Sequence, residues 1–145
     1  MDADSCPSLV RNHTVKMGNK LGLRVVFAAN KKIGCDVADG KYEMTVCSSE
    51  KDAADNYIFE NCKLGDLVIT RDIVFAGRLV EKGICTINDR GTEFTKEMIK
   101  ERLSISDFDR QLAEIGLVKH FHEGYDKKKF AEFANSFDKV IHRLI

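Results

Sequence analysis

Several features that would assign this chain to a class of proteins are absent from its sequence. Its 23 lysines and arginines balance 23 aspartates and glutamates, so the net charge is zero. The chain therefore lacks the basic excess typical of nucleic-acid-binding proteins, and binding a polyanion would need a local basic patch or a bridging metal ion. It also lacks internal repeats, low-complexity segments and linkers, so we interpret it as one domain.

Cysteine spacing and hydrophobicity exclude further classes. No two of the five cysteines have the close spacing of a zinc or redox motif, and we expect reduced thiols in a cytosolic protein. No apolar run is long enough to cross a membrane. The N-terminus lacks the basic and apolar regions of a signal peptide. We therefore expect a cytoplasmic protein without a membrane partner.

What the chain does contain is an alternation of strand and helix patterns. Short runs rich in β-branched and aromatic residues predict strands at 23–29, 42–47, 67–70 and 84–88. Helical spacing and end signals predict helices at 52–62, 73–81, 98–103, 107–114 and 127–144. This order predicts an α/β fold, a three-layer sandwich with a mainly parallel central sheet and helices on both faces.

In such sheets the functional site lies at the carboxyl ends of the strands. Asp72 follows the strand 67–70, whereas Asp66 precedes it. At about 3.3 Å per residue these two carboxylates stand roughly 20 Å apart and cannot share a metal ion. We therefore interpret Asp72 as a candidate site residue and Asp66 as a turn residue at the opposite edge of the sheet.

The first residues of the chain also have the pattern of a strand-to-helix turn. Asp2 and Asp4 are separated by one residue, Ser5 is able to cap a helix, and Pro7 suits a first helical turn. Capping by Asp4 or Ser5 is the structural alternative to a role in a site. Only Met1 precedes the two acids, so the strand that should deliver them is missing or one residue long.

Asp52 and Asp55 lie three residues apart in the first turn of the helix at 52–62. A favourable interaction with the helix dipole explains them without any function. If they instead converge with the strand-end acids on one cleft, the carboxylates raise each other's pKa unless a cation offsets their charge. A cluster of carboxylates alone suits Mg²⁺ or Mn²⁺, which activate water for attack on a phosphodiester.

Three motifs in order, at residues 2–7, 52–56 and 65–72, resemble the bacterial YaiI/YqxD family. A fourth, Asn88-Asp89-Arg90-Gly91, resembles that family's Asn-x-Arg-Gly stretch. The resemblance spans roughly residues 1–116. It implies a single PIN-like domain over 1–145, with C-terminal helices from about position 95, related to metal-dependent ribonucleases.

The resemblance also implies which residues act. Asp2, Asp55 and Asp72 match the acids of the PIN pattern, and Asp4 is a further acid of the YaiI/YqxD family beside Asp2. Together these four would hold Mg²⁺ or Mn²⁺ and carry the hydrolysis of RNA. In the family a short apolar strand precedes the first two acids. With only Met1 at that place, the sheet is expected to lose a strand and Asp2 to lose its anchor.

Four further polar residues are candidates for binding substrate. Thr70 belongs to the Thr-x-Asp turn, and Arg90 follows a strand where its guanidinium could bind phosphate through two donors. Asn30 and Asn88 are expected to end neighbouring strands, where they line the cleft or cap turns.

Two other functions remain open. The neutral charge and the missing first strand favour a non-catalytic nucleic-acid-binding or regulatory module. A phosphatase of the haloacid-dehalogenase type would use Asp2 as nucleophile and Asp4 as acid/base, with Thr70 as the second motif. No convincing lysine motif or downstream acidic pair follows for that phosphatase.

Overall fold

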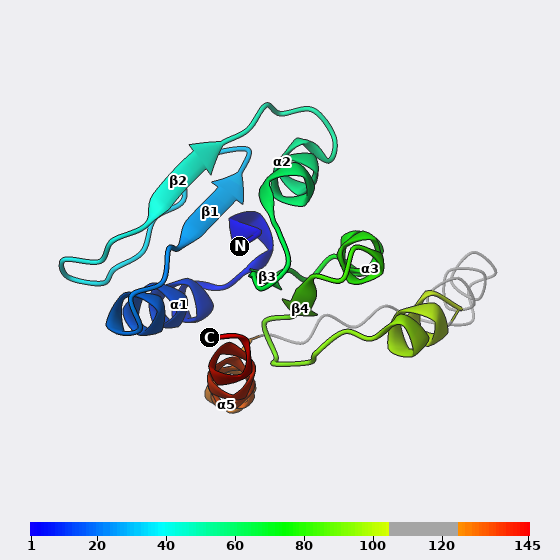
Figure 1. Cartoon of the computed structure of the whole chain (residues 1–145). Helices are drawn as coiled ribbons and strands as arrows, with labels where there is room; N and C mark the ends of the chain where they lie inside the picture. Colours follow the sequence, from blue (N-terminus) through cyan, green and yellow to red (C-terminus); the bar gives the residue numbers. More distant parts are fainter. Residues whose placement is uncertain (105–124) are drawn as a thin grey trace.

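The computed structural model describes residues 1–104 and 125–145, and it shows a mixed α/β fold with short parallel strands (Figure 1). The labelled elements are η1 (Ala3–Ser5), α1 (Ser8–Lys20), β1 (Val26–Ala29), β2 (Glu43–Val46), α2 (Ala53–Asn61), β3 (Leu67–Ile69), α3 (Ile73–Glu81), β4 (Cys85–Ile87) and α5 (Lys127–Leu144). Residues 96–104 are also helical. The predicted helix at 107–114 lies outside the described residues.

The helices begin and end where local chemistry favours it. The Asp72 side chain accepts a hydrogen bond from the Phe75 N–H and caps α3, which ends before Gly83 at a positive φ of 84°. Asp126 caps α5 in the same way, through the Lys129 N–H. Thr95 Oγ1 accepts from the Met98 N–H at 3.2 Å and caps the helix that follows it.

The strands form two parallel pairs, β1 with β2 and β3 with β4. Helices α1 and α5 lie on one side of these strands, and α2 and α3 on the other (Figure 1). One core cluster joins α1 and α5 to the ends of β3 and β4, through Cys6, Val10, Ile69, Ile87, Phe133, Phe137, Val140 and Ile141. Another joins α2 and α3 to β1 and β3, through Ala28, Ile58, Val68, Phe75, Leu79 and Ile84.

The space between β1 and β3 is bridged by the first two residues of the chain. The Met1 amino group donates to the Val26 carbonyl at 2.8 Å, and the Met1 carbonyl accepts from the Ala28 N–H at 3.0 Å. On the other side the Asp2 N–H donates to the Ile69 carbonyl at 3.0 Å. Asp2 is therefore held between both strand pairs, and the expectation that it loses its anchor is wrong.

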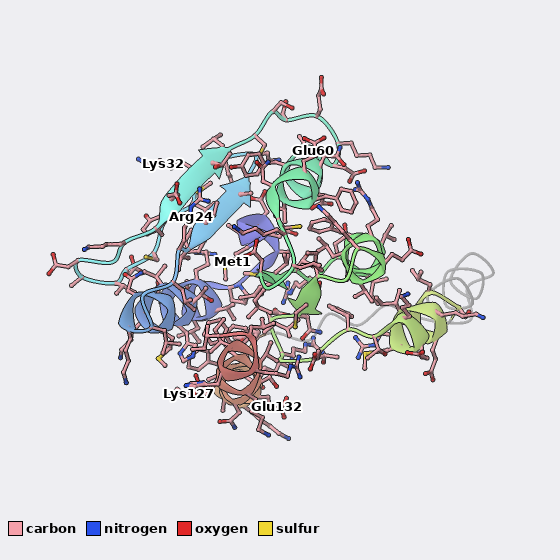
Figure 2. All side chains as sticks on the ribbon, viewed as in Figure 1. Met1, Arg24, Lys32, Glu60, Lys127 and Glu132 are labelled. Atoms are coloured by element: carbon pink, nitrogen blue, oxygen red, sulfur yellow. The ribbon has the colours of Figure 1, made fainter. Side chains whose placement is uncertain are left out.

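Towards the amino ends of the strands the two pairs separate. Among the described residues, no hydrogen bond joins β1 to β3 on this side of Met1. A cavity of about 500 Å³ occupies the space between them, and its lining includes Met1, Val26, Leu67 and Ile69. Figure 2 shows Met1 near the centre of the molecule, between β1 and β3. The sheet is therefore open at this end.

No helix in the described part of the chain combines the length and the apolar character that crossing a membrane requires.

Candidate functional site

Asp2 stands at the carboxyl end of the sheet, and its side chain is held by Thr70. Thr70 Oγ1 donates to Asp2 Oδ2 at 2.8 Å, from a residue with no exposed surface. Asp2 itself is 7% exposed. Burial raises the pKa of the Asp2 carboxyl, and the hydrogen bonds from Thr70 and Ser5 act in the opposite direction. Two segments 68 residues apart therefore fix one carboxylate.

Asp72 is joined to Asp2 through the same hydroxyl. The Asp72 N–H donates to Thr70 Oγ1 at 3.1 Å, while Asp72 Oδ1 accepts from the Phe75 N–H at 3.1 Å. The Asp72 side chain is exposed at the start of α3. Thr70 is thus a positioning residue at the end of β3, because its hydroxyl bonds to the buried Asp2 carboxylate and to the backbone N–H of Asp72.

Asp55, in the first turn of α2, faces the same region. Its pKa is raised to about 7 by burial first, and then by the charges of Asp2, Asp72 and Asp52. Arg78 acts in the opposite direction. Carboxylates from the chain start, α2 and the β3–α3 turn are therefore close enough to repel one another, as the predicted convergence requires.

Asp4 has a different environment from the other three predicted acids. Its side chain is exposed, and Oδ2 accepts from the Asn30 N–H at 3.1 Å, beside the end of β1. Neither Asp4 nor Ser5 caps a helix. Pro7 is the N-cap residue of α1 and offers no side-chain bond, while Ser5 Oγ donates to the Asp2 carbonyl.

Asp52 also makes no capping bond. It occupies the N-cap position of α2 with a left-handed backbone, φ 62°, and its side chain bonds to no N–H of that helix. What the structure gives Asp52 is a charge that contributes to the raised pKa of Asp55.

The oxygen donors suit a hard cation, but their arrangement limits how it is held. Within residues 1–104 and 125–145, no three aspartate, glutamate, histidine or cysteine side chains are grouped closely enough to hold one ion. Mg²⁺ keeps several waters and commonly takes one or two protein carboxylates together with substrate phosphates. At most two of the candidate ligands Asp2, Asp55 and Asp72 could therefore contact any one ion, and water or substrate would have to supply the other oxygens.

The two candidate asparagines do not end neighbouring strands. Asn30 follows β1 and Asn88 follows β4, and the segment Met1–Asp2 together with β3 lies between those strands. That expectation is wrong because chain order does not give strand order. Asn88 Oδ1 accepts from the N–H groups of Arg90 and Thr92, both at 2.9 Å, so Asn88 closes a turn. Arg90 is exposed on that turn.

Asp66 lies where the sequence predicts, in the turn before β3. Its Oδ2 accepts from the Lys63 N–H at 3.0 Å, at the end of the sheet opposite Asp72. The interpretation of Asp66 as a turn residue is confirmed.

One pair beside the site escapes prediction from the sequence. Arg71 Nε donates to Asp89 Oδ2 at 2.7 Å, and the Asp89 side chain is only 2% exposed. The sequence offered one signal for Arg71, namely its position between the candidate residues Thr70 and Asp72. Nothing signalled Asp89, because an Asp-Arg-Gly sequence after a strand is typical of an exposed turn.

Comparison with known proteins gives one consistent result. The family described as "Uncharacterized BCR, YaiI/YqxD family" matches residues 1–143. The chain is 43% identical to a UPF0178 protein of Treponema denticola, over all of this chain and 92% of that protein. It is 33% identical to a UPF0178 protein of Myxococcus xanthus, over all of this chain and 94% of the relative. No solved structure shows a significant match.

Proposed function

The chain belongs to the YaiI/YqxD family, and we propose that it is a divalent-metal-dependent phosphodiesterase with a PIN-like fold that acts on RNA. One observation carries the proposal. Asp2, Asp55 and Asp72 come from three separate segments, yet they stand close enough for two of these charges to raise the pKa of the third. Repulsion of this kind favours a bound cation, which removes its cost.

The fold supports the same proposal. Parallel strands with helices on both sides are what a three-layer, PIN-like sandwich requires. Asp2 and Asp72 lie at the carboxyl end of the sheet, and Asp55 lies in the first turn of α2. The five cysteines are all free, as expected for a protein in the reducing cytoplasm.

The protein's own residues would divide the work. Thr70 fixes the orientation of Asp2 through a hydrogen bond, so the Asp2 carboxylate is held in one rotamer at the site. Asp72 uses Oδ1 for its helix cap, which leaves Oδ2 for a ligand. Asp55 changes charge near pH 7, so a cation and a proton compete for it. A bound Mg²⁺ or Mn²⁺ would activate water and neutralise charge on the phosphodiester.

The test is cleavage of a mixed pool of single-stranded and structured RNA, with and without Mg²⁺ or Mn²⁺. Asp55→Asn and Asp72→Asn should each reduce the metal-dependent rate by roughly a hundredfold or more, since both remove charge that holds the ion. Glu60→Gln is the matched control, because Glu60 is an exposed acid on the same helix as Asp55 (Figure 2).

Cleavage that survives both aspartate substitutions would mean that other groups, or a contaminant, carry the activity. Cleavage that needs no divalent ion would contradict the role given to the carboxylates. The Glu60→Gln control should cleave like the wild type, so a loss there would point to a general defect in α2.

A non-catalytic RNA-binding or regulatory module is the second candidate, and one observation favours it. No three of the described aspartate, glutamate, histidine or cysteine side chains are grouped closely enough to hold one ion, so a cation bound to protein alone would be held loosely. Under this alternative the wild type binds RNA without cutting it, and its melting temperature does not respond to Mg²⁺, Mn²⁺ or EDTA.

The haloacid-dehalogenase alternative receives less support. Thr70 does stand beside Asp2, at 2.8 Å, as that reading expects. Asp4, which would serve as the acid/base, is instead tied to the Asn30 N–H. Hydrolysis of a phosphate monoester with loss in Asp2→Asn would revive this function.

A further inference from the structure

An ion pair between Arg71 and the buried Asp89 has no part in the chemistry proposed so far. Arg71 Nε and Asp89 Oδ2 are 2.7 Å apart, and the two side chains differ sharply in exposure, 49% for Arg71 and 2% for Asp89. A buried carboxylate is costly unless it is paired, so Asp89 fixes the guanidinium that neutralises it. The arginine, however, keeps half of its surface in solvent.

The backbone of Arg71 is anchored as well. Its N–H donates to Ser5 Oγ at 3.2 Å, and Ser5 Oγ in turn donates to the Asp2 carbonyl at 3.1 Å. On the other side, Tyr125 OH donates to the Asp89 carbonyl at 2.7 Å and holds the turn that carries Asp89. Arg71 is therefore positioned from both the chain start and the β4 turn.

The guanidinium has donors to spare. It carries five N–H groups in a fixed plane, and the bond to Asp89 uses the one on Nε. Among the described residues, the Nη1 and Nη2 groups of Arg71 have no hydrogen-bond acceptor. An arginine held through Nε presents its two terminal nitrogens outward, in the geometry that binds a phosphate through two parallel hydrogen bonds.

Arg71 lies in the turn that follows β3, at the carboxyl end of the sheet. It lies between Thr70 and Asp72 in the chain, and the Thr70 hydroxyl donates to Asp2 and accepts from the Asp72 backbone N–H at the carboxyl end of β3. A phosphate bound by Arg71 would therefore lie at the same end of the sheet as the carboxylates. Arg90, the phosphate contact expected from sequence, is exposed on the next turn, and its described contact is a backbone bond to Asn88.

We propose that Arg71, oriented by Asp89, is the phosphate-binding residue of this site, and that it grips the backbone of single-stranded RNA beside the carboxylates. The inference rests on the proposed function for its substrate. It makes Asp89 a positioning residue that acts through Arg71. It also gives a chain of zero net charge a local, pre-oriented cation for a polyanion.

The experiment measures binding of a fluorescent single-stranded RNA oligonucleotide with Ca²⁺ in place of Mg²⁺, over a range of salt concentrations. Arg71→Gln should weaken binding roughly tenfold. It should also lower the slope of log affinity against log salt by about 0.7, the value for one phosphate contact on a single strand. Arg71→Lys should restore the salt slope but only part of the affinity, since lysine offers no second parallel donor.

Arg24→Gln is the matched control. Arg24 is also an exposed arginine paired to a carboxylate, that of Glu43, but it precedes β1 at the opposite end of the sheet (Figure 2). Its loss should leave both affinity and salt slope near the wild-type values. Asp89→Asn should weaken binding less than Arg71→Gln. A melting curve shows whether that variant is folded, and the two Arg71 variants decide the matter if it is not.

The outcomes separate the two proposals. If the wild type binds RNA and Arg71→Gln behaves like Arg24→Gln, the role of Arg71 is wrong and the proposed function stands. If the wild type binds with the expected Arg71 dependence but never cleaves, the phosphodiesterase is wrong and Arg71 remains an RNA contact. If the wild type neither binds nor cleaves RNA, both are wrong.

Discussion

The two ends of the sheet are built in opposite ways. At the carboxyl end, polar side chains are fixed by specific bonds, as Thr70 joins Asp2 to Asp72 and Asp89 holds Arg71. At the amino end, β1 and β3 separate around a cavity of about 500 Å³ with Met1 at its inner end. The difference shows that side-chain hydrogen bonds fix the end of the sheet that carries the candidate site, and that the sheet tolerates an opening at its other end.

Met1 and Asp2 explain why the sheet is joined at its carboxyl end and open at its amino end. Two residues span only about 7 Å in an extended conformation, so they join the strand pairs at one end and leave the other end open. The hydrogen bonds of Met1 to Val26 and Ala28, and of Asp2 to Ile69, are enough to fix the acid without a longer strand. The following predictions test this contrast.

The largest effect is expected from Thr70→Val, which keeps the shape of the side chain and removes the hydroxyl. Asp2 then loses a buried donor, and the free energy of unfolding should fall by about 1–3 kcal/mol. The loss should be greater at pH 8 than at pH 4, because the charged carboxylate needs the donor more. Urea unfolding at both pH values measures it.

Thr86→Val serves as the control for this prediction. Thr86 is equally buried on the neighbouring strand, but its hydroxyl bonds only to the Ile84 carbonyl, at 3.1 Å. Its loss should be smaller and independent of pH. Equal, pH-independent losses in both variants would show that Thr70 supports packing and not the carboxylate.

A smaller effect, of opposite sign, is expected from Asp55→Asn. The folded state holds the Asp55 proton up to about pH 7, whereas the unfolded state releases it near the ordinary value of 3.8. Stability therefore falls as pH rises from about 4 to 7. The asparagine variant escapes this loss and should melt about 2–4 °C higher than the wild type at pH 8, with no difference at pH 4.

Divalent ions should oppose this difference in melting temperature between the wild type and Asp55→Asn. Mg²⁺ should raise the melting temperature of the wild type at pH 8 and leave Asp55→Asn unchanged, since a cation offsets the repulsion only where the charge exists. The exposed Glu60 provides the comparison again, and Glu60→Gln should respond to pH and Mg²⁺ like the wild type. A lower melting temperature for Asp55→Asn at pH 8 would contradict the assigned repulsion.

The smallest effect concerns the open end. Burial lowers the pKa of the Met1 amino group, so the folded state disfavours its charge. The resulting loss of stability is greatest below the lowered pKa and fades as pH rises towards 8.0. Acetylation of Met1 removes the charge and keeps an N–H for the Val26 carbonyl, and it should raise the melting temperature by about 1–3 °C at pH 6.

Scanning calorimetry of acetylated and free protein at pH 6 and 8 measures this difference. The gain should shrink at pH 8, because half of the amines in the unfolded state have lost their proton at that pH and the folded state, with its lowered pKa, has lost still more. A gain that is equal at the two pH values would mean that the acetyl group acts by filling the cavity and not by removing a charge.

Much of the fold follows from the sequence because its signals are local. The strands 67–70 and 84–88 and the helices 73–81 and 127–144 were predicted from hydrophobic period and end signals, and the structure has them as β3, β4, α3 and α5 with ends that shift by at most two residues. Asp66 and Asp72 were separated by strand length alone. These predictions needed no knowledge of which segments meet.

The helix α1 was not predicted, and the errors about the site arose where distant segments meet. Asp2 was expected to lose its anchor, because hydrogen bonds to Ile69 and Thr70 cannot be seen from its neighbours in the chain. Asn30 and Asn88 were predicted to end neighbouring strands. This was wrong because the order of strands in a sheet cannot be inferred from residues close together in the chain. The pairing of Arg71 with Asp89 joins two turns after different strands, and neither turn shows a signal of it.

By itself, the sequence determined the α/β alternation, the family, and a set of acids at strand ends and helix starts. These depend on residue type and spacing over a few turns of chain. Only the tertiary structure decided which acids face one another, that Thr70 binds Asp2, and that Arg71 stands oriented beside them. Those facts depend on burial and on contacts between segments up to 68 residues apart, and spacing along the chain carries no information about them.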